Sequence, residues 1–273
     1  MTGRRNIAGL AAAVAIIVAA AVLALAASRT AGFQYRDPFD PLPSPEAQRT
    51  GTVVQGAPDP ERRLGAFLVF VFNDIQGFWA STLERSGIEY APATLVVFRG
   101  IVGSGCGLAS ASVGPFYCAL DRRVYLDAGF VRQLAVEFRA PGDFAQAYVI
   151  AHEVGHHVQN LLGIAGRIQE AQGKRSRTDA NALQVKMELQ ADCLAGVWAN
   201  NAQRARQILE SGDIEEGLNA AAAIGDDRLQ KMSAGVVQPE SFTHGSSQQR
   251  VEWLRRGLES GSPGSCNTFQ GVF

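Results

Sequence analysis

His152-Glu153-Val154-Gly155-His156 is the most informative stretch of the chain, because it places two histidines four residues apart with a glutamate beside the first. On a helix, residues four apart lie on one face, so two histidines at this spacing can bind one Zn²⁺ ion. Glu153 stands beside the first histidine, where it can act on a water molecule without being a ligand. Three of the four histidines of the chain fall within residues 152–157, which favours a metal site over a chance match.

Apolar residues recur every three or four positions over residues 144–162, and this periodicity predicts a helix. Pro141-Gly142 breaks the chain before it, Asp143 is the expected N-cap, and Gly163 follows where a C-cap glycine belongs. The segment is apolar nearly all round, so we expect the helix to be buried. A metal would then offset the cost of burying two histidines.

Two residues of this helix have other expected roles. Gly155 has no side chain, which would let a neighbouring helix or a substrate approach closely. His157 points about 100° away from His156 on a helix of 3.6 residues per turn. We therefore expect His157 to pack or to support the site, and not to bind the metal.

A catalytic zinc site usually has three protein ligands, so a third is needed. The metzincin pattern would place a glycine and a histidine at the positions of Gln159 and Leu162, which excludes that class. Residues 179–201 predict a second helix, on which Glu188 and Asp192 lie four apart. We predict that Glu188 is the third ligand and that Asp192 accepts the N–H of a ligand histidine. The alternative is a solvated acidic edge of an amphipathic helix.

Residues 152–157 together with 188–193 resemble the bacterial neutral zinc metallopeptidase family, a membrane-anchored group of Glu-zincins. The resemblance covers roughly residues 60–270, and further stretches that carry it are 113–118, 124–127, 243–247 and 266–269. It implies a zinc-dependent peptidase, without naming a physiological substrate.

The chemistry that we expect is hydrolysis of a peptide bond, with one Zn²⁺ per chain held by His152, His156 and Glu188. Glu153 would act as general base and acid. His244, in a loop before a helix, is the candidate second donor to the oxyanion, and a plain surface histidine is the alternative. Two other functions stay open: a metal-dependent hydrolase acting on cell-wall cross-links, and a non-catalytic envelope protein with structural zinc.

The N-terminal part predicts attachment to the membrane. Residues 7–27 are 21 residues without a charge, preceded by Arg4 and Arg5, so residues 1–28 predict a single-pass anchor with the rest of the chain outside the cytoplasm. A cleaved signal peptide, which would make the protein secreted, is the alternative. Residues 29–59 predict a Pro-rich linker, since six of the eleven prolines fall between positions 38 and 60. Residues 60–273 would form the zinc metallopeptidase domain.

Charge and cysteine content indicate the kind of partner and the disulfide bonds that we expect. The net charge is −1, from 25 basic and 26 acidic residues, and nothing in this balance suggests a nucleic-acid partner. The partner that we expect, from the site, is a peptide or protein substrate. The four cysteines predict two disulfides in an exported domain. We favour Cys106–Cys118, because the Gly-rich sequence between them can turn back, which leaves Cys193–Cys266. Four reduced thiols are the alternative.

The expected fold class is α+β: a mainly helical, zincin-like domain with a small sheet, preceded by one transmembrane helix. Besides the two site helices, we predict helices at 60–87, 213–232 and 246–258, a strand at 95–98, and a hairpin of 116–118 with 124–126. Asp213 with Glu216, and Ser246 with Gln249, stand at capping-box spacing.

Three segments have expected roles near the cleft or the surface. Strand 124–127 is the candidate edge strand that pairs with substrate, and Asp127 would close the cleft. Residues 166–178 predict a mobile loop between the two ligand helices, and Gly103-Ser104-Gly105-Cys106-Gly107 predicts a surface loop.

Overall fold

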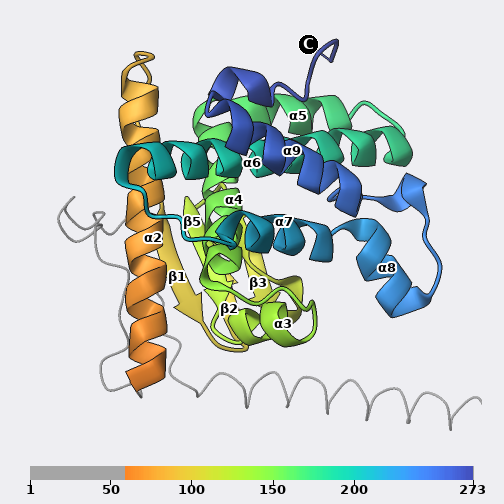
Figure 1. Cartoon of the computed structure of the whole chain (residues 1–273). Coiled ribbons are helices and arrows are strands. Elements are labelled where there is room, and N and C mark those ends of the chain that lie inside the picture. Colours follow the sequence, from red (N-terminus) through yellow and green to blue (C-terminus); the bar gives the residue numbers. More distant parts are fainter. Residues whose placement is uncertain (1–58, 273) are drawn as a thin grey trace, which may run out of the picture. The chain divides into compact units, whose positions relative to one another are not determined.

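Helices dominate the computed structural model, which describes residues 59–272, and two small sheets lie beside the central helix α4 (Figure 1). The predicted α+β class is confirmed. The predicted anchor and nearly all of the predicted linker lie outside the described residues. The helices are α2 (Asp59–Glu84), α3 (Phe130–Val136), α4 (Asp143–Leu161), α5 (Ile164–Gln172), α6 (Arg177–Arg206), α7 (Asp213–Ala223), α8 (Asp226–Ala234) and α9 (Ser247–Ser260).

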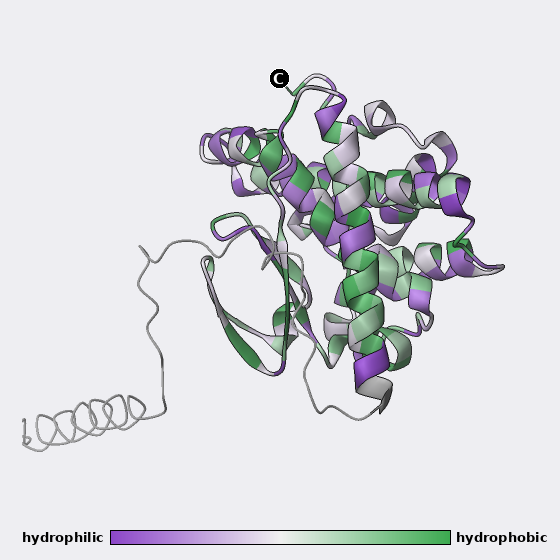
Figure 2. Ribbon diagram, turned by 90° about the vertical axis from the view of Figure 1, so that its left-hand side faces the viewer, coloured by the Kyte–Doolittle hydropathy of each residue, from purple (hydrophilic) through white to green (hydrophobic). Residues whose placement is uncertain are grey.

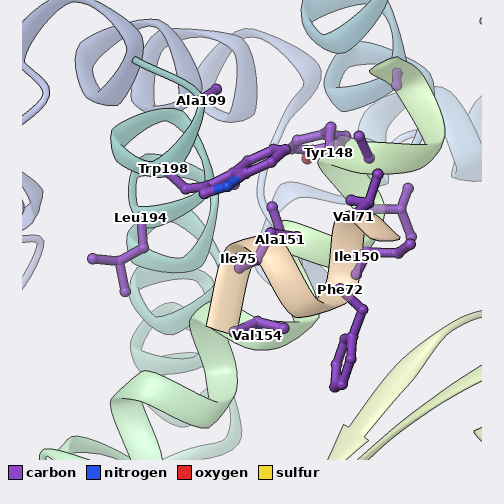
Figure 3. Packing of buried hydrophobic residues seen from close by; sticks show 14 of the residues in the cluster. Val71, Phe72, Ile75, Tyr148, Ile150, Ala151, Val154, Leu194, Trp198 and Ala199 are labelled. Carbon is purple, nitrogen blue, oxygen red and sulfur yellow. The ribbon is translucent and has the colours of Figure 1, made fainter. Parts of the chain in front are cut away.

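The core forms where α4 is enclosed by α2, α6, α7 and the sheet. Tyr148, Ile150, Ala151 and Val154 of α4 are at most 1% exposed. Figure 3 shows them between side chains of α2 (Val71, Phe72, Ile75) and of α6 (Leu194, Trp198, Ala199). Each large side chain buried in this way contributes roughly 1.5–3 kcal/mol to folding. The helix that carries the two histidines is therefore held on several sides, as its apolar sequence predicts.

Helix α2 is the one helix among residues 59–272 that is long and apolar enough, by length and composition, to cross a membrane, over Arg62–Glu84. In Figure 2, where α2 faces the viewer, its middle turns are coloured as apolar. A helix that packs into a core has the same property, and Leu68, Ile75 and Trp79 of α2 are at most 1% exposed.

The main sheet has the strand order β1 (Thr94–Phe98), β5 (Arg123–Asp127), β4 (Phe116–Cys118). Strand β5 runs parallel to β1 and antiparallel to β4, which confirms the predicted hairpin. The prediction that 124–127 is the edge strand is wrong, because β5 has a neighbour on both sides. Its four buried residues in a row are typical of a central strand. The edge strand beside α4 is β4.

Several local predictions also need correction. Asp127 does not close a cleft: it is buried, and its carboxylate accepts the backbone N–H of Gly100 and of Gly129. The N-cap of α4 is Gly142, and Asp143 is the first helical residue. Residues 103–107 belong to a hairpin of β2 (Ile101–Ser104) and β3 (Gly107–Ser110) rather than to a loop.

Two predicted segments differ in helix content. Residues 213–232 form two helices, α7 and α8, because the chain breaks at Gly225, and the N-cap of α7 is Gly212, so Asp213 does not form the capping box. Residues 166–178 are mostly helix α5 and the start of α6, not a mobile loop. The capping box of Ser246 and Gln249 at the start of α9 is confirmed.

Close helix packing and one of two disulfides hold the site helix α6 in place. The structure pairs Cys106 with Cys118 and Cys193 with Cys266, as predicted. The second bond ties α6 to the C-terminal segment. Helix α9 lies directly on α6, because a Cβ on Gly257 would be only 2.0 Å from the carbonyl oxygen of Cys193. A side chain at position 257 would push these two helices apart.

Candidate metal centre

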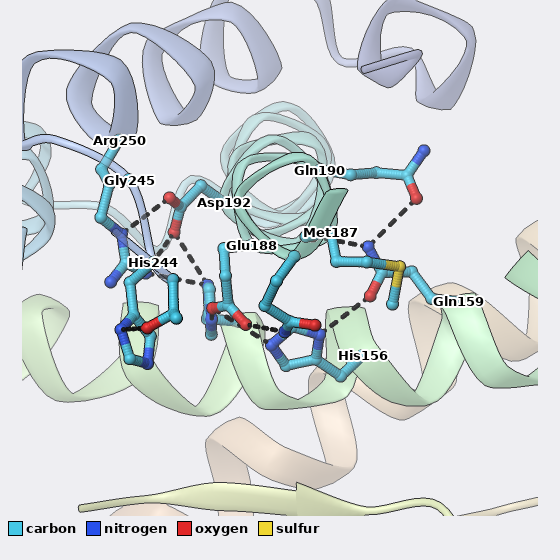
Figure 4. A network of polar contacts seen from close by, with 12 residues as sticks. His156, Gln159, Met187, Glu188, Gln190, Asp192, His244, Gly245 and Arg250 are labelled. Carbon is cyan, nitrogen blue, oxygen red and sulfur yellow. Dashed lines mark hydrogen bonds and ion pairs between the residues drawn. The ribbon is translucent and has the colours of Figure 1, made fainter. Parts of the chain in front are cut away.

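The site is built where α4 and α6 approach each other. A Cβ atom added to Gly155 would lie 3.1 Å from the backbone of Ala191, so the absence of a side chain allows this approach. The expected role of Gly155 in close helix packing is confirmed. Figure 4 shows the consequence: Glu188 and Asp192 of α6 reach down toward the histidines of α4.

The structure brings His152, His156 and Glu188 together, with one potential ligand atom from each within 4.8 Å of the others. Oε2 of Glu188 lies 3.1 Å from Nε2 of His152 and 3.5 Å from Nε2 of His156. Two zinc bonds of about 2.0–2.1 Å at a tetrahedral angle would hold their ligand atoms about 3.3 Å apart. The three side chains, all largely buried, therefore fit one zinc ion in both donor type and spacing.

Each histidine is oriented by a partner on its other ring nitrogen. Nδ1 of His152 lies 2.8 Å from Oδ1 of Asp192, and Nδ1 of His156 lies 2.8 Å from Oε1 of Gln159. Both oxygens accept an N–H, so both rings carry a proton on Nδ1 and turn Nε2, the nitrogen that a metal would bind, toward Glu188. Oxygen partners of this kind typically orient and strengthen histidine ligands.

Gln159 is itself held by two hydrogen bonds. Its Nε2 donates to the carbonyl oxygen of Met187 at 2.8 Å and to Oε1 of Gln190 at 3.1 Å. These bonds turn its Oε1 toward His156. The third potential ligand is fixed similarly, because Nε2 of Gln184 donates at 2.9 Å to Oε1 of Glu188, while Oε2 is the oxygen that lies close to both histidines.

Asp192 is fully buried and forms the centre of a charged network. Nε and Nη2 of Arg250, from α9, both donate to its carboxylate at 2.9 Å, and Tyr148 donates to Oδ1 at 2.6 Å. A buried carboxylate needs this compensation, because desolvation alone would cost several kcal/mol. Arg250 thus links the last helix to the orientation of His152.

The electrostatics of the cluster favour a cation between the histidines and Glu188. Burial would lower the pKa of His152, but the charge and hydrogen bond of Asp192 raise that pKa to about 10. Burial would raise the pKa of Glu188, but His156 and His152 hold it well below its usual value. Burial would likewise raise the pKa of Asp192, and Arg250 lowers it. The carboxylates therefore stay ionised and attract positive charge, as a proton or as a metal ion.

The cluster opens into a cavity of about 590 Å³. Its lining includes, besides the potential ligands, the polar and charged residues Glu153, Gln184, His244 and Arg250. Glu153 is 7% exposed. The structure thus brings the predicted base, Glu153, and the predicted second donor, His244, into one cavity with the three potential ligands.

His244 is held by a carboxylate that the sequence does not single out. Oδ2 of Asp226 accepts the backbone N–H groups of Thr243, His244 and Gly245 at 2.6–3.0 Å, and Oδ1 lies 3.1 Å from Nδ1 of His244. The hydrogen bond to Asp226 raises the pKa of the His244 imidazole. Asp226 therefore fixes both the loop and the ring, and leaves Nε2 as the free nitrogen.

His157 supports the edge strand, in agreement with the expectation that it does not face the metal. Its Nε2 lies 2.7 Å from the carbonyl oxygen of Ala91, and its Nδ1 lies 2.9 Å from the hydroxyl of Tyr117 on β4. Burial lowers the pKa of His157 to about 4. The neutral ring donates to Ala91 and accepts from Tyr117, which places β4 along the cavity.

Sequence reasoning missed four residues of the site: Tyr148, Gln159, Asp226 and Arg250. Two of them carried a local signal, since Tyr148 is four residues before His152 and Gln159 is three after His156, both spacings of a shared helix face. Asp226 and Arg250 lie on α8 and α9, and no local pattern joins them to the pentapeptide.

The family model described as "Putative neutral zinc metallopeptidase" matches residues 3–269 of this chain. The chain belongs to this family. Among members of known sequence, "Uncharacterized protein YpfJ" of Escherichia coli (strain K12) is 49% identical over 209 residues, which cover 77% of this chain and 72% of that protein. "Uncharacterized protein Rv2575" of Mycobacterium tuberculosis (strain ATCC 25618 / H37Rv) is 43% identical over 222 residues, with the same coverage. No solved structure matches this chain significantly.

Proposed function

We propose that the protein is a zinc-dependent endopeptidase that acts outside the cytoplasmic membrane. One observation carries the proposal: His152, His156 and Glu188 point their potential ligand atoms at one spot beside a cavity that Glu153 also lines. A structural zinc site has four protein ligands and needs no base. Three ligands, an adjacent carboxylate and an open side toward a cavity are instead typical of a hydrolytic centre.

His152, His156 and Glu188 would hold the zinc ion. When bound, zinc supplies Lewis acidity, which polarises the scissile carbonyl and lowers the pKa of a water molecule toward about 7. Glu153 takes a proton from the attacking water and passes it to the amine nitrogen that leaves. His244, with Nδ1 held by Asp226, donates from Nε2 to the carbonyl oxygen as negative charge develops there.

The free edge of β4 would bind the peptide chain. Phe116 and Tyr117 of this strand line the cavity, and β5 pairs with the opposite edge of β4. An extended peptide could add to the sheet here by main-chain hydrogen bonds, as in other cases of strand addition. This arrangement would be that of a zincin-like cleft, with β4 in the role that the sequence assigned to residues 124–127.

Location outside the cytoplasm is supported by two disulfides in the domain. The uncharged stretch at residues 7–27 would supply the single-pass anchor. Peptides or proteins of the envelope would then be the substrates.

The test is the Glu153→Gln variant of the full chain, solubilised in detergent and supplied with zinc. We expect one zinc per chain in both the wild type and the variant, by native mass spectrometry, and cleavage of unfolded casein by the wild type alone. Turnover by the variant would remove Glu153 from its role, and a wild type that binds no zinc would overturn the proposal. A peptidoglycan panel run in parallel separates protein cleavage from hydrolysis of cell-wall cross-links.

A further inference from the structure

The cavity has an apolar wall that the proposed chemistry does not use. Among the purely apolar lining residues, we give the name apolar wall to five that come from α3, α4, the segment after α3, and α7–α8: Phe130, Phe138, Val149, Ile224 and Leu229. Of these, Phe138, Ile224 and Leu229 are only partly buried, so apolar surface faces the cavity. An open apolar surface of this kind favours an apolar ligand group.

The apolar wall begins directly beside the proposed general base. Val149 is four residues before Glu153 on α4, so the two side chains lie on one face of the helix, one turn apart. Both line the cavity. A peptide whose scissile bond lies at Glu153 would therefore place a neighbouring side chain against Val149.

Hydrogen bonds hold the other parts of the wall in position. Nη2 of Arg228, on α8, donates to the carbonyl oxygen of Phe138 at 3.1 Å, which ties α8 to the segment after α3. Nη1 of Arg250 donates to the carbonyl oxygen of Ile224 at 3.3 Å, so the same arginine that binds Asp192 also fixes this side of the wall. A wall fixed before the ligand arrives loses little conformational entropy on binding.

Two charged groups of this region are already engaged: Arg250 donates to Asp192, and Asp226 accepts from the 243–245 loop. Gln133 on α3 is an uncharged polar residue of the lining. An acidic or basic side chain placed against Phe138, Ile224 and Leu229 would lose hydration to an apolar surface, which costs free energy unless an ion pair replaces it.

We propose that the apolar wall is a subsite for a large aliphatic or aromatic side chain of the substrate, next to the bond that is cut. This inference rests on the proposed peptidase function and names its substrate class: polypeptides that present Leu, Phe or a similar residue in an extended segment. Such segments are buried in folded proteins, so unfolded or partly unfolded chains would be the preferred substrates.

The experiment uses internally quenched heptapeptides of Gly and Ala in which the central residue is Phe, Leu, Ala, Asp or Lys. The zinc-loaded full chain is assayed in detergent, and mass spectrometry maps each cut. We expect kcat/KM for the Phe and Leu peptides to exceed that for the Ala peptide roughly 10–100-fold, and the cut to fall beside the central residue. Equal rates for all five peptides, or a preference for Asp or Lys, would overturn the proposal.

A matched pair of variants on α8 tests the wall itself. Leu229→Arg places a cation in the subsite and should abolish the preference for Phe while improving cleavage of the Asp peptide. Met232→Arg adds the same charge on the same helix at a residue that is 55% exposed and outside the lining, and should keep the wild-type preference. If Leu229→Arg fails to fold, Leu229→Ala should still reduce the ratio of the Phe rate to the Ala rate. An unchanged ratio in the Leu229 variants would show that the wall is not the subsite.

A binding series separates this inference from the proposed function. The Glu153→Gln variant, loaded with zinc, is titrated with the five peptides and each dissociation constant is measured by fluorescence anisotropy. Tighter binding of the Phe and Leu peptides supports the subsite even if the wild type cuts none of them, a result that would overturn the peptidase function alone. Equal binding of all five would overturn the subsite even if casein is cleaved.

Discussion

Nδ1 of His152 lies 2.8 Å from Oδ1 of Asp192, and this contact joins the proposed metal site to a buried ion pair. The same carboxylate binds Arg250 through two hydrogen bonds of 2.9 Å. Asp192 therefore orients a potential ligand on one side and neutralises a buried cation on the other.

Asp192→Asn should weaken zinc binding roughly 10–100-fold, because His152 loses the charged partner that orients it. The variant should also lose about 3–5 kcal/mol of the free energy of unfolding, since Arg250 would be left as an unpaired buried charge. Competition with a zinc chelator and chemical denaturation measure the two effects. Asp179→Asn, at the exposed first turn of the same helix, is the control and should bind zinc like the wild type. Unchanged zinc affinity in Asp192→Asn would contradict the orienting role.

Glu188→Ala should lose the metal. It removes one of three potential ligands and leaves two histidines, which is too few for a stable zinc site. The measurement is the zinc content after dialysis, with Glu153→Gln as a control that changes a carboxylate in the same cavity but should retain one zinc per chain. Full occupancy in Glu188→Ala would mean that another residue is the third ligand.

His244→Phe should lower kcat roughly 10²–10³-fold with little change in KM or in zinc content, because a donor to the oxyanion acts only in the transition state. His244→Gln keeps a donor group and should recover part of the loss. Steady-state kinetics on a peptide that the wild type cleaves give kcat and KM for both variants. Equal losses in both variants, or a change in KM alone, would argue for a structural role of this loop.

The stability of the metal-free protein should depend on pH through His157. Burial lowers its folded-state pKa to about 4, against 6.5 for an ordinary histidine. As pH falls from 7 to 4, His157 becomes protonated in the unfolded chain but stays largely neutral in the folded chain. The free energy of unfolding should therefore fall by about 3 kcal/mol on account of this residue. Above about pH 6.5 this contribution is fully present.

Denaturant unfolding of the wild type and of His157→Gln, both without metal, isolates that contribution from those of other groups. Glutamine can still donate to Ala91 and accept from Tyr117, but it does not titrate. The two curves of stability against pH should therefore diverge between pH 6.5 and pH 4. Parallel curves would show that His157 does not resist protonation.

The two disulfides should differ in their contribution to stability. Cys193 and Cys266 are 73 residues apart, and Cys106 and Cys118 are 12 apart. From loop-closure entropy, the double substitution Cys193→Ala with Cys266→Ala should lower the free energy of unfolding by about 4 kcal/mol. Cys106→Ala with Cys118→Ala should lower it by about 3 kcal/mol. Calorimetry of both double variants measures which of them is less stable. Only the first pair should also reduce zinc affinity, because it holds the helix that carries Glu188.

Much of the site could be predicted from the sequence because it depends on helix periodicity. The spacing of His152 with His156, and of Glu188 with Asp192, places each pair on one helix face before any tertiary structure is known. The apolar surroundings of residues 144–162 likewise predict that this helix is buried, and the structure agrees. The separate helices 213–223 and 226–234 were harder to predict, since a single glycine breaks a pattern that otherwise continues.

Local sequence patterns are sufficient to predict the α+β class, the two site helices with their carboxylates and imidazoles, and the even set of cysteines. That β4 and not β5 is the edge strand follows only from the folded structure, because strand order depends on pairing between segments far apart in the chain. The contacts of Arg250 with Asp192 and of Asp226 with His244 also come from tertiary packing, since they span 58 and 18 residues and need α9 to pack on α6 and the loop before α9 to meet the start of α8. Helix periodicity places side chains on one face of a helix, and packing between distant segments determines which helix faces contact each other.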